Sequence, residues 1–334
     1  MSSRLIVPGR RALVAALNAA GANVRAATLE ELPRHGLAHR HWRLKGHGLV
    51  LRVPILPGSP QTLARQAAIF ERAAASGHTP ALHAVLPSSR DLPLGALLVE
   101  AVGGEVPRVP EHLAAIATAL AAIHGLKVPR VRAPIPAPAE PFAATLALIE
   151  QNMERGALAL TPETSAILDA ERRWARGFAR DHAKKLRTAP RTLIVTDAHP
   201  RNFRIVRAHS GKDRAICLDL ERGQYASPAI DLAHAILPMA VAWGRAGERL
   251  SAANRRRFLD AYFKARGAAA SRALRPWLQP FARLVALRTT AAYAAFQVSG
   301  AERVLEPAAR TLARQAIADA LEAERLAKFF SAMQ

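Results

Sequence analysis

LIVTDAHPRNF, at positions 193–203, concentrates polar side chains between two short apolar runs. Asp197 and Asn202 are separated by four residues, and apolar stretches lie directly before and after them. Apolar runs of this length, bounded by proline and polar residues, are typical of strands. The pattern therefore predicts a strand, a loop and a second strand, with both polar side chains on the loop.

A second stretch, ICLDLERGQYASPAIDLAH at positions 216–234, carries another carboxylate. Asp219 follows the apolar run 215–218, where a hairpin partner of the second strand would end. Transfer of a phosphoryl group needs a carboxylate to orient and deprotonate the attacking hydroxyl, and oxygen ligands for the Mg²⁺ that bridges the phosphates. If Asp219 meets the loop of Asp197 and Asn202, the three side chains would supply one base and two metal ligands.

The order of these motifs resembles the aminoglycoside phosphotransferase and choline kinase superfamily. Its usual pattern is a His-Gly-Asp-Leu-His-Pro-x-Asn loop, an Ile-Asp-x-Glu strand and an Asp-Leu-Ala helix start, and this chain reads VTDAHPRN, LDLE and DLAH. The resemblance implies that Asp197 is the catalytic base, and that Asn202 and Asp219 are Mg²⁺ ligands. It also implies that Asp231 is a structural carboxylate bracing the loop.

The same resemblance implies an α+β, protein-kinase-like bilobal fold. Residues 1–102 would form a small nucleotide-binding lobe, with an antiparallel sheet and a helix, that ends in a hinge. Residues 103–334 would form a larger, mostly helical lobe with the catalytic loop and the acceptor site, and 334 residues suit such a pair. Periodicity, caps and prolines predict helices over 61–75, 111–124, 142–155 and 163–186, a proline-rich connection over 128–141, and helices beyond Pro238 with turns near Gly247, Gly267 and Pro276.

Three segments of the N-terminal third resemble the family's nucleotide-binding elements. In 29–44 only Gly36 is present for the glycine turn that covers the phosphates, and a lone turn glycine is the alternative interpretation. In 48–60 Arg52 occupies the position of the basic residue that contacts the α and β phosphates, and its planar fork could hold phosphate oxygens bidentately. In 96–107 the main-chain groups of Glu100 and Val102 would contact adenine, with an ordinary buried strand before a Gly-Gly turn as the alternative.

The chain also departs from the family pattern. Val195 and Thr196 stand where the family has His-Gly, which removes a polar contact that often steadies the loop. Gln66 stands where a glutamate usually pairs with the basic residue of the strand, so a contact from the Gln66 amide to Arg52 is a hypothesis. These departures make a pseudokinase, which binds nucleotide without turnover, the main alternative to an ATP-dependent small-molecule kinase.

The net charge of +21 points to a second alternative, a basic nucleic-acid-binding protein. The excess is mostly arginine spread along an alanine-rich chain, as a GC-rich coding background would give. Proteins that stack on bases interleave aromatic with basic residues, whereas aromatics make up only 5% of this chain. We therefore expect no specific nucleic-acid partner.

The identity of the acceptor stays open. Aminoglycosides are polycations that need acidic acceptor sites, and choline-type substrates need an aromatic box. Such a box could draw on four aromatic residues, which at these spacings are more typical of a core: Trp243, Tyr262, Trp277 and Tyr293. The sequence predicts a small-molecule hydroxyl acceptor of unspecified class, ATP and Mg²⁺ as cofactors, and leaves the oligomeric state open.

The cysteine content and the lengths of the apolar stretches indicate the cellular environment. The only cysteine, Cys217, excludes an internal disulfide and predicts a reducing, cytoplasmic environment. No apolar stretch reaches the roughly 20 residues that span a bilayer, so we expect no membrane partner.

Overall fold

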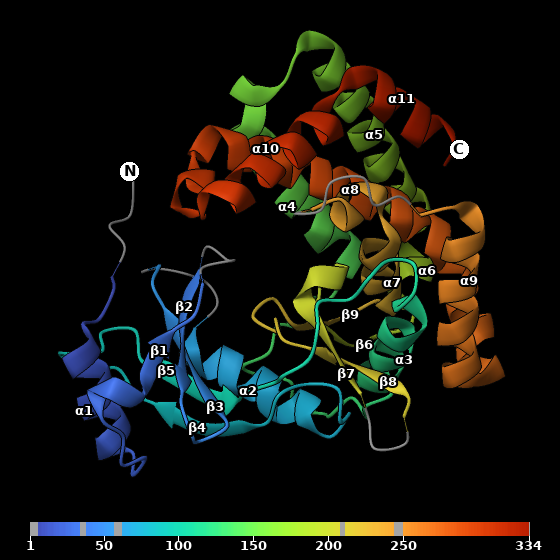
Figure 1. The fold of residues 1–334 in the computed structure, drawn as a ribbon. Helices are drawn as coiled ribbons and strands as arrows, with labels where there is room; N and C mark the ends of the chain where they lie inside the picture. The colour runs from blue at the N-terminus through green and yellow to red at the C-terminus, as the bar shows by residue number, and fades with distance from the viewer. Residues whose placement is uncertain (1–5, 34–37, 57–61, 208–210, 244–249, 334) are drawn as a thin grey trace.

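A five-stranded antiparallel sheet of order β1-β2-β3-β5-β4 forms the N-terminal part of the molecule (Figure 1). The computed structural model describes residues 6–33, 38–56, 62–207, 211–243 and 250–333. The elements of this part are α1 Arg10–Ala19, η1 Ala26–Thr28, β1 Leu29–Glu31, β2 His39–Leu44, β3 Leu49–Pro54, α2 Leu63–Ala74, β4 Leu82–Leu86 and β5 Ala96–Glu100.

The two faces of this sheet pack against different partners because strand side chains alternate. On β3, Leu51 and Val53 belong to the apolar cluster that α1 shares, on the outer side of the sheet. Val50 packs instead against the main core, and Arg52 lies over the ring of Phe70 on α2, 5.5 Å from its centroid. The alternation thus directs Arg52 toward α2 and the rest of the molecule.

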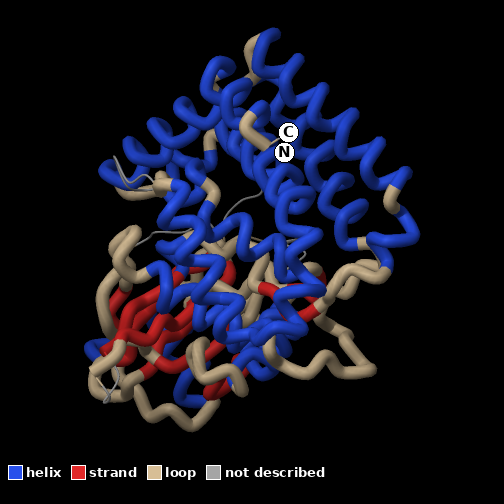
Figure 2. The backbone as a smooth tube through the Cα atoms, turned by 90° about the vertical axis from the view of Figure 1, so that its right-hand side faces the viewer, coloured by secondary structure: helices blue, strands red, loops and turns tan. Residues whose placement is uncertain are grey.

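Helices fill the opposite end of the molecule (Figure 2). The long helix α9 contacts α3, α4 and α7. It bends at Gly267, whose φ of 82° is not helical. These helices are α3 Leu113–His124, α4 Pro141–Gly156, η2 Ala157–Ala159, α5 Pro162–Asp181, α6 Ala183–Arg187, α7 Pro228–Ile236, α8 Pro238–Val241, α9 Ala252–Ser299, η4 Ala301–Val304, α10 Pro307–Leu321 and α11 Ala323–Ser331.

Most of the helices expected from the sequence are present. The segment between α3 and α4 contains no helix or strand, as its prolines predict. The turn expected near Pro276 is wrong, because α9 continues through Pro276 and Pro280. The turn expected near Gly247 lies outside the described residues. Among the described helices, none is both long and apolar enough to cross a bilayer.

Two small antiparallel pairs lie between the sheet and the helices. β6 Thr192–Ile194 pairs with β9 Gln224–Ala226, and β7 Phe203–Arg207 pairs with β8 Asp213–Cys217. In the second pair Phe203 lies opposite Cys217, so the loop before β7 and the residues after β8 meet at the same end of the hairpin. The predicted strand, loop, strand and hairpin partner are therefore all present.

The Gly-Gly turn after β5 connects the sheet to this hairpin. Glu105 and Ile205 exchange main-chain hydrogen bonds of 3.1 and 2.8 Å. Gly104 has a φ of 93°, and a Cβ atom there would lie 2.1 Å from the carbonyl oxygen of Ile205. Only glycine permits this close approach, which fixes the end of the β5 segment against β7.

Candidate active site

Asp231 braces the loop between β6 and β7. Its carboxylate is fully buried at the start of α7 and accepts hydrogen bonds of 2.7 Å from the main-chain N–H groups of Val195 and Thr196. His124 Nε2, from α3, lies 3.1 Å from the same carboxylate, and His124 Nδ1 lies 2.9 Å from the hydroxyl of Tyr262 on α9. A fully buried carboxylate with three partners fixes the loop relative to two helices.

We expect Asp231→Ala to destabilise the protein by roughly 3–5 kcal/mol, because three buried polar groups would lose their shared acceptor. Urea denaturation of the variant measures this loss. The matched control is Asp181→Ala, which removes an exposed carboxylate at the end of α5 and should change stability by less than about 0.5 kcal/mol. Equal effects of the two substitutions would contradict the bracing role.

Thr196 adopts a left-handed backbone conformation, with a φ of 70°. This position aligns with the glycine of the family motif quoted above, a residue that adopts the left-handed conformation at little cost. Three contacts hold the residue: its N–H donates to Asp231, its hydroxyl accepts from Gln224 Nε2 at 3.2 Å, and its carbonyl accepts from Arg288 Nη2 at 3.1 Å. The surrounding contacts therefore hold a left-handed conformation at a position that has no glycine in this chain.

We expect Thr196→Gly to be more stable than Thr196→Ala by about 1 kcal/mol, since only glycine adopts the left-handed conformation without steric cost. Both variants lose the hydroxyl contact with Gln224, so their comparison isolates the backbone effect. Chemical denaturation of the two proteins side by side provides the measurement. An alanine variant as stable as the glycine variant would show that φ at this position is not strained.

Asp197, the predicted base, directs its carboxylate toward two histidines. Oδ1 lies 3.4 Å from His234 Nδ1 and 3.9 Å from His199 Nε2. Burial alone would raise the pKa of Asp197, but these histidines, Arg222 and Arg288 outweigh it and lower that pKa to about 2. Burial lowers the pKa of His234 to about 3 and also lowers that of His199. Asp197 is therefore an anion at neutral pH.

The two predicted metal ligands lie beside this loop. Asn202 Nδ2 donates to the main-chain oxygen of Asp197 at 2.8 Å, which leaves Asn202 Oδ1 as the atom that can bind a cation. The main-chain oxygen of Asn202 accepts from Leu218 N–H at 2.8 Å, and Asp219 follows directly. Burial and the charge of Glu221 raise the pKa of Asp219 to about 6, against the opposing effect of Arg52. The structure thus brings Asp197, Asn202 and Asp219 together.

Arg52 joins the sheet to this cluster. It is 7% exposed, its Nη1 donates to the carbonyl oxygen of Leu218 at 3.2 Å, and its Nη2 lies 3.6 Å from Asp219 Oδ1. Gln66 is buried on α2, as the predicted contact with Arg52 would require, and its Oε1 lies 3.0 Å from His39 Nε2. His39 Nδ1 lies 2.8 Å from Glu221. A chain of polar contacts thus connects β2, α2 and the residues after β8.

The other predicted nucleotide contacts are only partly described. Gly36 lies outside the described residues. Glu100 and Val102 line a cavity of about 330 Å³ together with Thr79, whose buried hydroxyl has no hydrogen-bond partner among the described residues. The N–H of Glu100 donates to the carbonyl of Ala81 on the neighbouring segment. The N–H of Glu100 is therefore engaged within the structure, so the predicted contact with adenine could not use this group.

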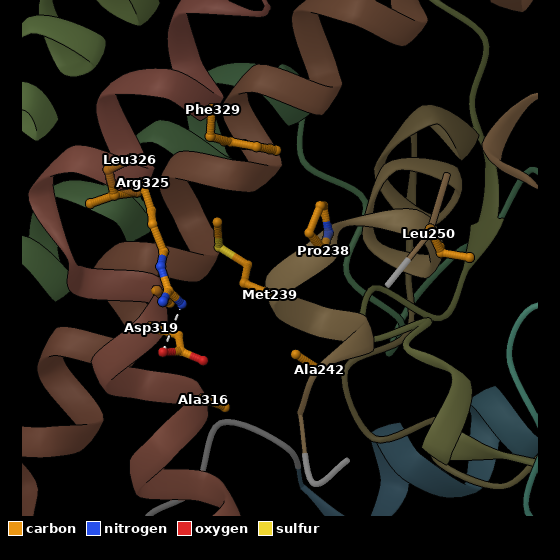
Figure 3. A pocket seen from close by; sticks show the side chains of 10 residues that line it. Pro238, Met239, Ala242, Leu250, Ala316, Asp319, Arg325, Leu326 and Phe329 are labelled. Carbon is orange, nitrogen blue, oxygen red and sulfur yellow. Dashed lines mark ion pairs between the residues drawn. The ribbon is translucent and has the colours of Figure 1, made fainter. Parts of the chain in front are cut away.

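A larger cavity of about 510 Å³ lies between α8, α10 and α11 (Figure 3). Its lining is mostly apolar, and its one carboxylate, Asp319, pairs with Arg325 at 2.8 Å. Met239, which lines this cavity, accepts a hydrogen bond at its main-chain oxygen from the hydroxyl of Tyr293 at 3.1 Å. The pKa of Tyr293 is raised by burial and also by the charge of Asp197.

Several residues of this site gave no signal in the sequence. Arg288 lies in the alanine-rich helix α9, where one arginine among many has no distinguishing pattern. His234 belongs to the DLAH motif, but its approach to Asp197 depends on how α7 packs. The His39 to Glu221 pair joins residues far apart in the chain, which spacing alone does not reveal.

Comparison with known proteins identifies the family and the fold. The model of the phosphotransferase enzyme family matches residues 29–281. A search of curated protein sequences finds no significant match. A Plasmodium vivax ethanolamine kinase has a similar structure, with a TM-score of 0.64 and 13% identity over 95% of this chain and 89% of that one. A choline/ethanolamine kinase family protein from Mesorhizobium loti gives a TM-score of 0.61 and 19% identity over 97% of each chain.

A third similar structure is an aminoglycoside 2'-phosphotransferase-IIIa in complex with GDP. Its TM-score is 0.62, with 14% identity over 98% of this chain and 100% of that one. At these identities the structural likeness establishes the fold alone, and it confirms the predicted kinase-like arrangement of a small antiparallel-sheet lobe and a helical part. The family match covers most of the chain, and we conclude that this protein belongs to the phosphotransferase enzyme family.

Proposed function

We propose that this protein transfers a phosphoryl group from ATP to a hydroxyl of a small molecule. The observation that carries the proposal is the connected position of Asp197, Asn202 and Asp219, linked through hydrogen bonds of 2.8 Å at Asn202. A carboxylate base beside an amide and a second carboxylate is the set of groups that phosphoryl transfer requires.

Asp197 would act on the acceptor. As an anion it can orient the hydroxyl and accept its proton while the hydroxyl oxygen forms a bond to the γ-phosphorus. The bond from that phosphorus to the leaving oxygen of ADP breaks in the same step, so ADP and the phosphorylated acceptor are the products. The proton then leaves Asp197 for solvent, because a pKa of about 2 does not retain it at neutral pH.

The residues present fit a magnesium ion. Mg²⁺ is usually bound by one or two carboxylates together with substrate phosphates and water, and the set here is Asp219 with Asn202 Oδ1. Burial and the negative Glu221 leave Asp219 short of compensating positive charge, a deficit that a cation would relieve. When bound, Mg²⁺ would neutralise charge on the phosphates.

Arg52 and the residues after β5 would hold the nucleotide. The guanidinium of Arg52 already reaches Asp219, so its position suits contact with phosphates that share the metal. Glu100 and Val102 would offer main-chain groups to the base. Nucleotide use in general is supported by two similar structures, an aminoglycoside 2'-phosphotransferase-IIIa and APH(2'')-IIIa with kanamycin, which were solved as complexes with the guanine nucleotide GDP.

The proposal is tested by measuring ADP formation and phosphorylated product with purified protein, ATP, Mg²⁺ and a panel of hydroxyl compounds. We expect product formation that needs Mg²⁺ and stops when a chelator is added. Saturable ATP binding without turnover on any acceptor would identify a pseudokinase instead. Absence of ATP binding would overturn the proposed function.

A further inference from the structure

Two arginines act electrostatically on Asp197: Arg288 on α9 and Arg222 in the turn before β9. Arg288, on α9, is half-buried and reaches the residue before Asp197, where its Nη2 donates to the carbonyl of Thr196. A guanidinium has five N–H donors, and among the described residues Thr196 is the only hydrogen-bond acceptor found for Arg288. Arg288 also has no carboxylate within ion-pair distance in that part of the chain. Most of its donors are therefore available to a ligand.

The carboxylates near Arg288 are committed elsewhere. Asp231 is fully buried and saturated by two N–H groups and His124. Glu221 pairs with His39, and Asp219 lies beside Arg52 at the predicted metal position. Among the described residues whose charge acts on Arg288, this leaves Asp197 itself, which an acceptor hydroxyl would occupy, as the uncommitted carboxylate.

The aromatic residues that could have formed a box for a quaternary ammonium are also engaged. Trp243 and Tyr293 stack on each other with ring centroids 5.2 Å apart. Tyr262 is 1% exposed and bonded to His124, and Trp277 packs against Phe281. Recognition of a quaternary ammonium needs several aromatic faces gathered around one space. Each of these four side chains instead has a packing or hydrogen-bond partner of its own, as the sequence pattern of core aromatics predicts.

We propose that the acceptor of this enzyme carries a negative charge, as a hydroxy acid or a phosphorylated hydroxyl compound does, and that Arg288 binds its anionic group. The inference rests on the proposed phosphotransferase function and adds the class of its substrate. Arg222, an exposed residue whose charge also acts on Asp197, would add to the attraction. A guanidinium suits this role because it donates two parallel hydrogen bonds to a carboxylate or phosphate.

The test uses acceptors that differ in charge but little in size. Gluconate, glucose and glucosamine form one series, and glycerate, glycerol and serinol form another, with glycerol 3-phosphate as the phosphorylated anion. We expect kcat/KM for the anionic members to exceed that for the cationic members at least about tenfold, the scale of a hydrogen bond to a charged group. A preference for the cationic members would overturn the inference.

The variant Arg288→Gln tests the assignment of Arg288 as the ligand of the anionic group. We expect it to raise KM for the anionic acceptors by about ten- to a hundredfold and KM for the neutral acceptors less than about twofold, with partial recovery in Arg288→Lys. Arg272→Gln, which removes an exposed arginine of the same helix, should leave all values unchanged. An equal loss of kcat on every acceptor would show that Arg288 only holds the loop, and would overturn its assignment as the anion ligand.

Binding of Mg²⁺ and ATP, measured by calorimetry, separates the two levels of failure. If the wild-type protein binds ATP but phosphorylates none of the anionic compounds, the proposed acceptor class is wrong, whereas nucleotide binding is confirmed. If the protein does not bind ATP, the proposed function itself fails.

Discussion

Replacing Asp197 with asparagine should lower turnover at least about 10²-fold, the usual scale for losing acid–base assistance. Asparagine has nearly the same shape but cannot accept the hydroxyl proton. The loop should keep its structure, because the hydrogen bond from Asn202 goes to the main-chain oxygen of residue 197, not to its side chain. Steady-state kinetics of the variant, with calorimetry of ATP binding, would measure kcat and affinity separately.

Asp181→Asn is the matched control for this experiment, since it makes the same chemical change at an exposed position on α5. We expect the control to retain wild-type kcat and both proteins to bind ATP with similar affinity. Because the pKa of Asp197 is about 2, its carboxylate stays ionised above about pH 4. A fall in wild-type activity near pH 6 would therefore come from another group. Unchanged turnover in Asp197→Asn would refute the assignment of Asp197 as base.

The sequence was informative where function requires particular residues in a fixed local order. Asp197 and Asn202 share one loop, and Asp219 is joined to it by a short hairpin, so local pairing rules were enough to predict their meeting. The outer and inner faces of the sheet also follow from alternation along β3. These features depend on neighbours within about thirty residues, which periodicity and turn signals describe.

Tertiary packing explains what the sequence did not reveal. Pro276 interrupts the hydrogen bonds of α9 only locally, and burial of later residues such as Phe281 and Leu284 keeps the helix continuous. Thr196 adopts a conformation that its side chain disfavours, because Asp231 and Arg288 hold its N–H and carbonyl from two different helices. Such an outlier at a site is visible only when the surrounding structure is known.

An ionised Asp219 favours metal binding but lowers the stability of the fold. Replacing Asp219 with asparagine should separate these two effects. The folded-state pKa of Asp219 is about 6, above the value near 3.9 expected for the unfolded chain. Between these values the folded protein binds a proton that the unfolded chain does not, so the contribution of Asp219 to stability declines as pH rises through that window. Above about pH 6 the carboxylate is ionised in both the folded and the unfolded state. Its unfavourable contribution to the free energy of unfolding is then at its largest and no longer changes with pH.

We therefore expect Asp219→Asn to be inactive yet more stable than wild type at pH 8 in a chelator, by about 1–2 kcal/mol after allowing for the 32% exposure of the side chain. The difference should vanish near pH 4, where the wild-type carboxyl group is protonated. Adding Mg²⁺ with ATP should reverse the order at pH 8, because a ligand stabilises only the protein that binds it. Thermal unfolding of both proteins, with and without Mg²⁺ and ATP, measures each comparison. A variant less stable than wild type at pH 8 in chelator would mean that Arg52 compensates the partly buried carboxylate fully, and that the site does not depend on a cation for its charge balance.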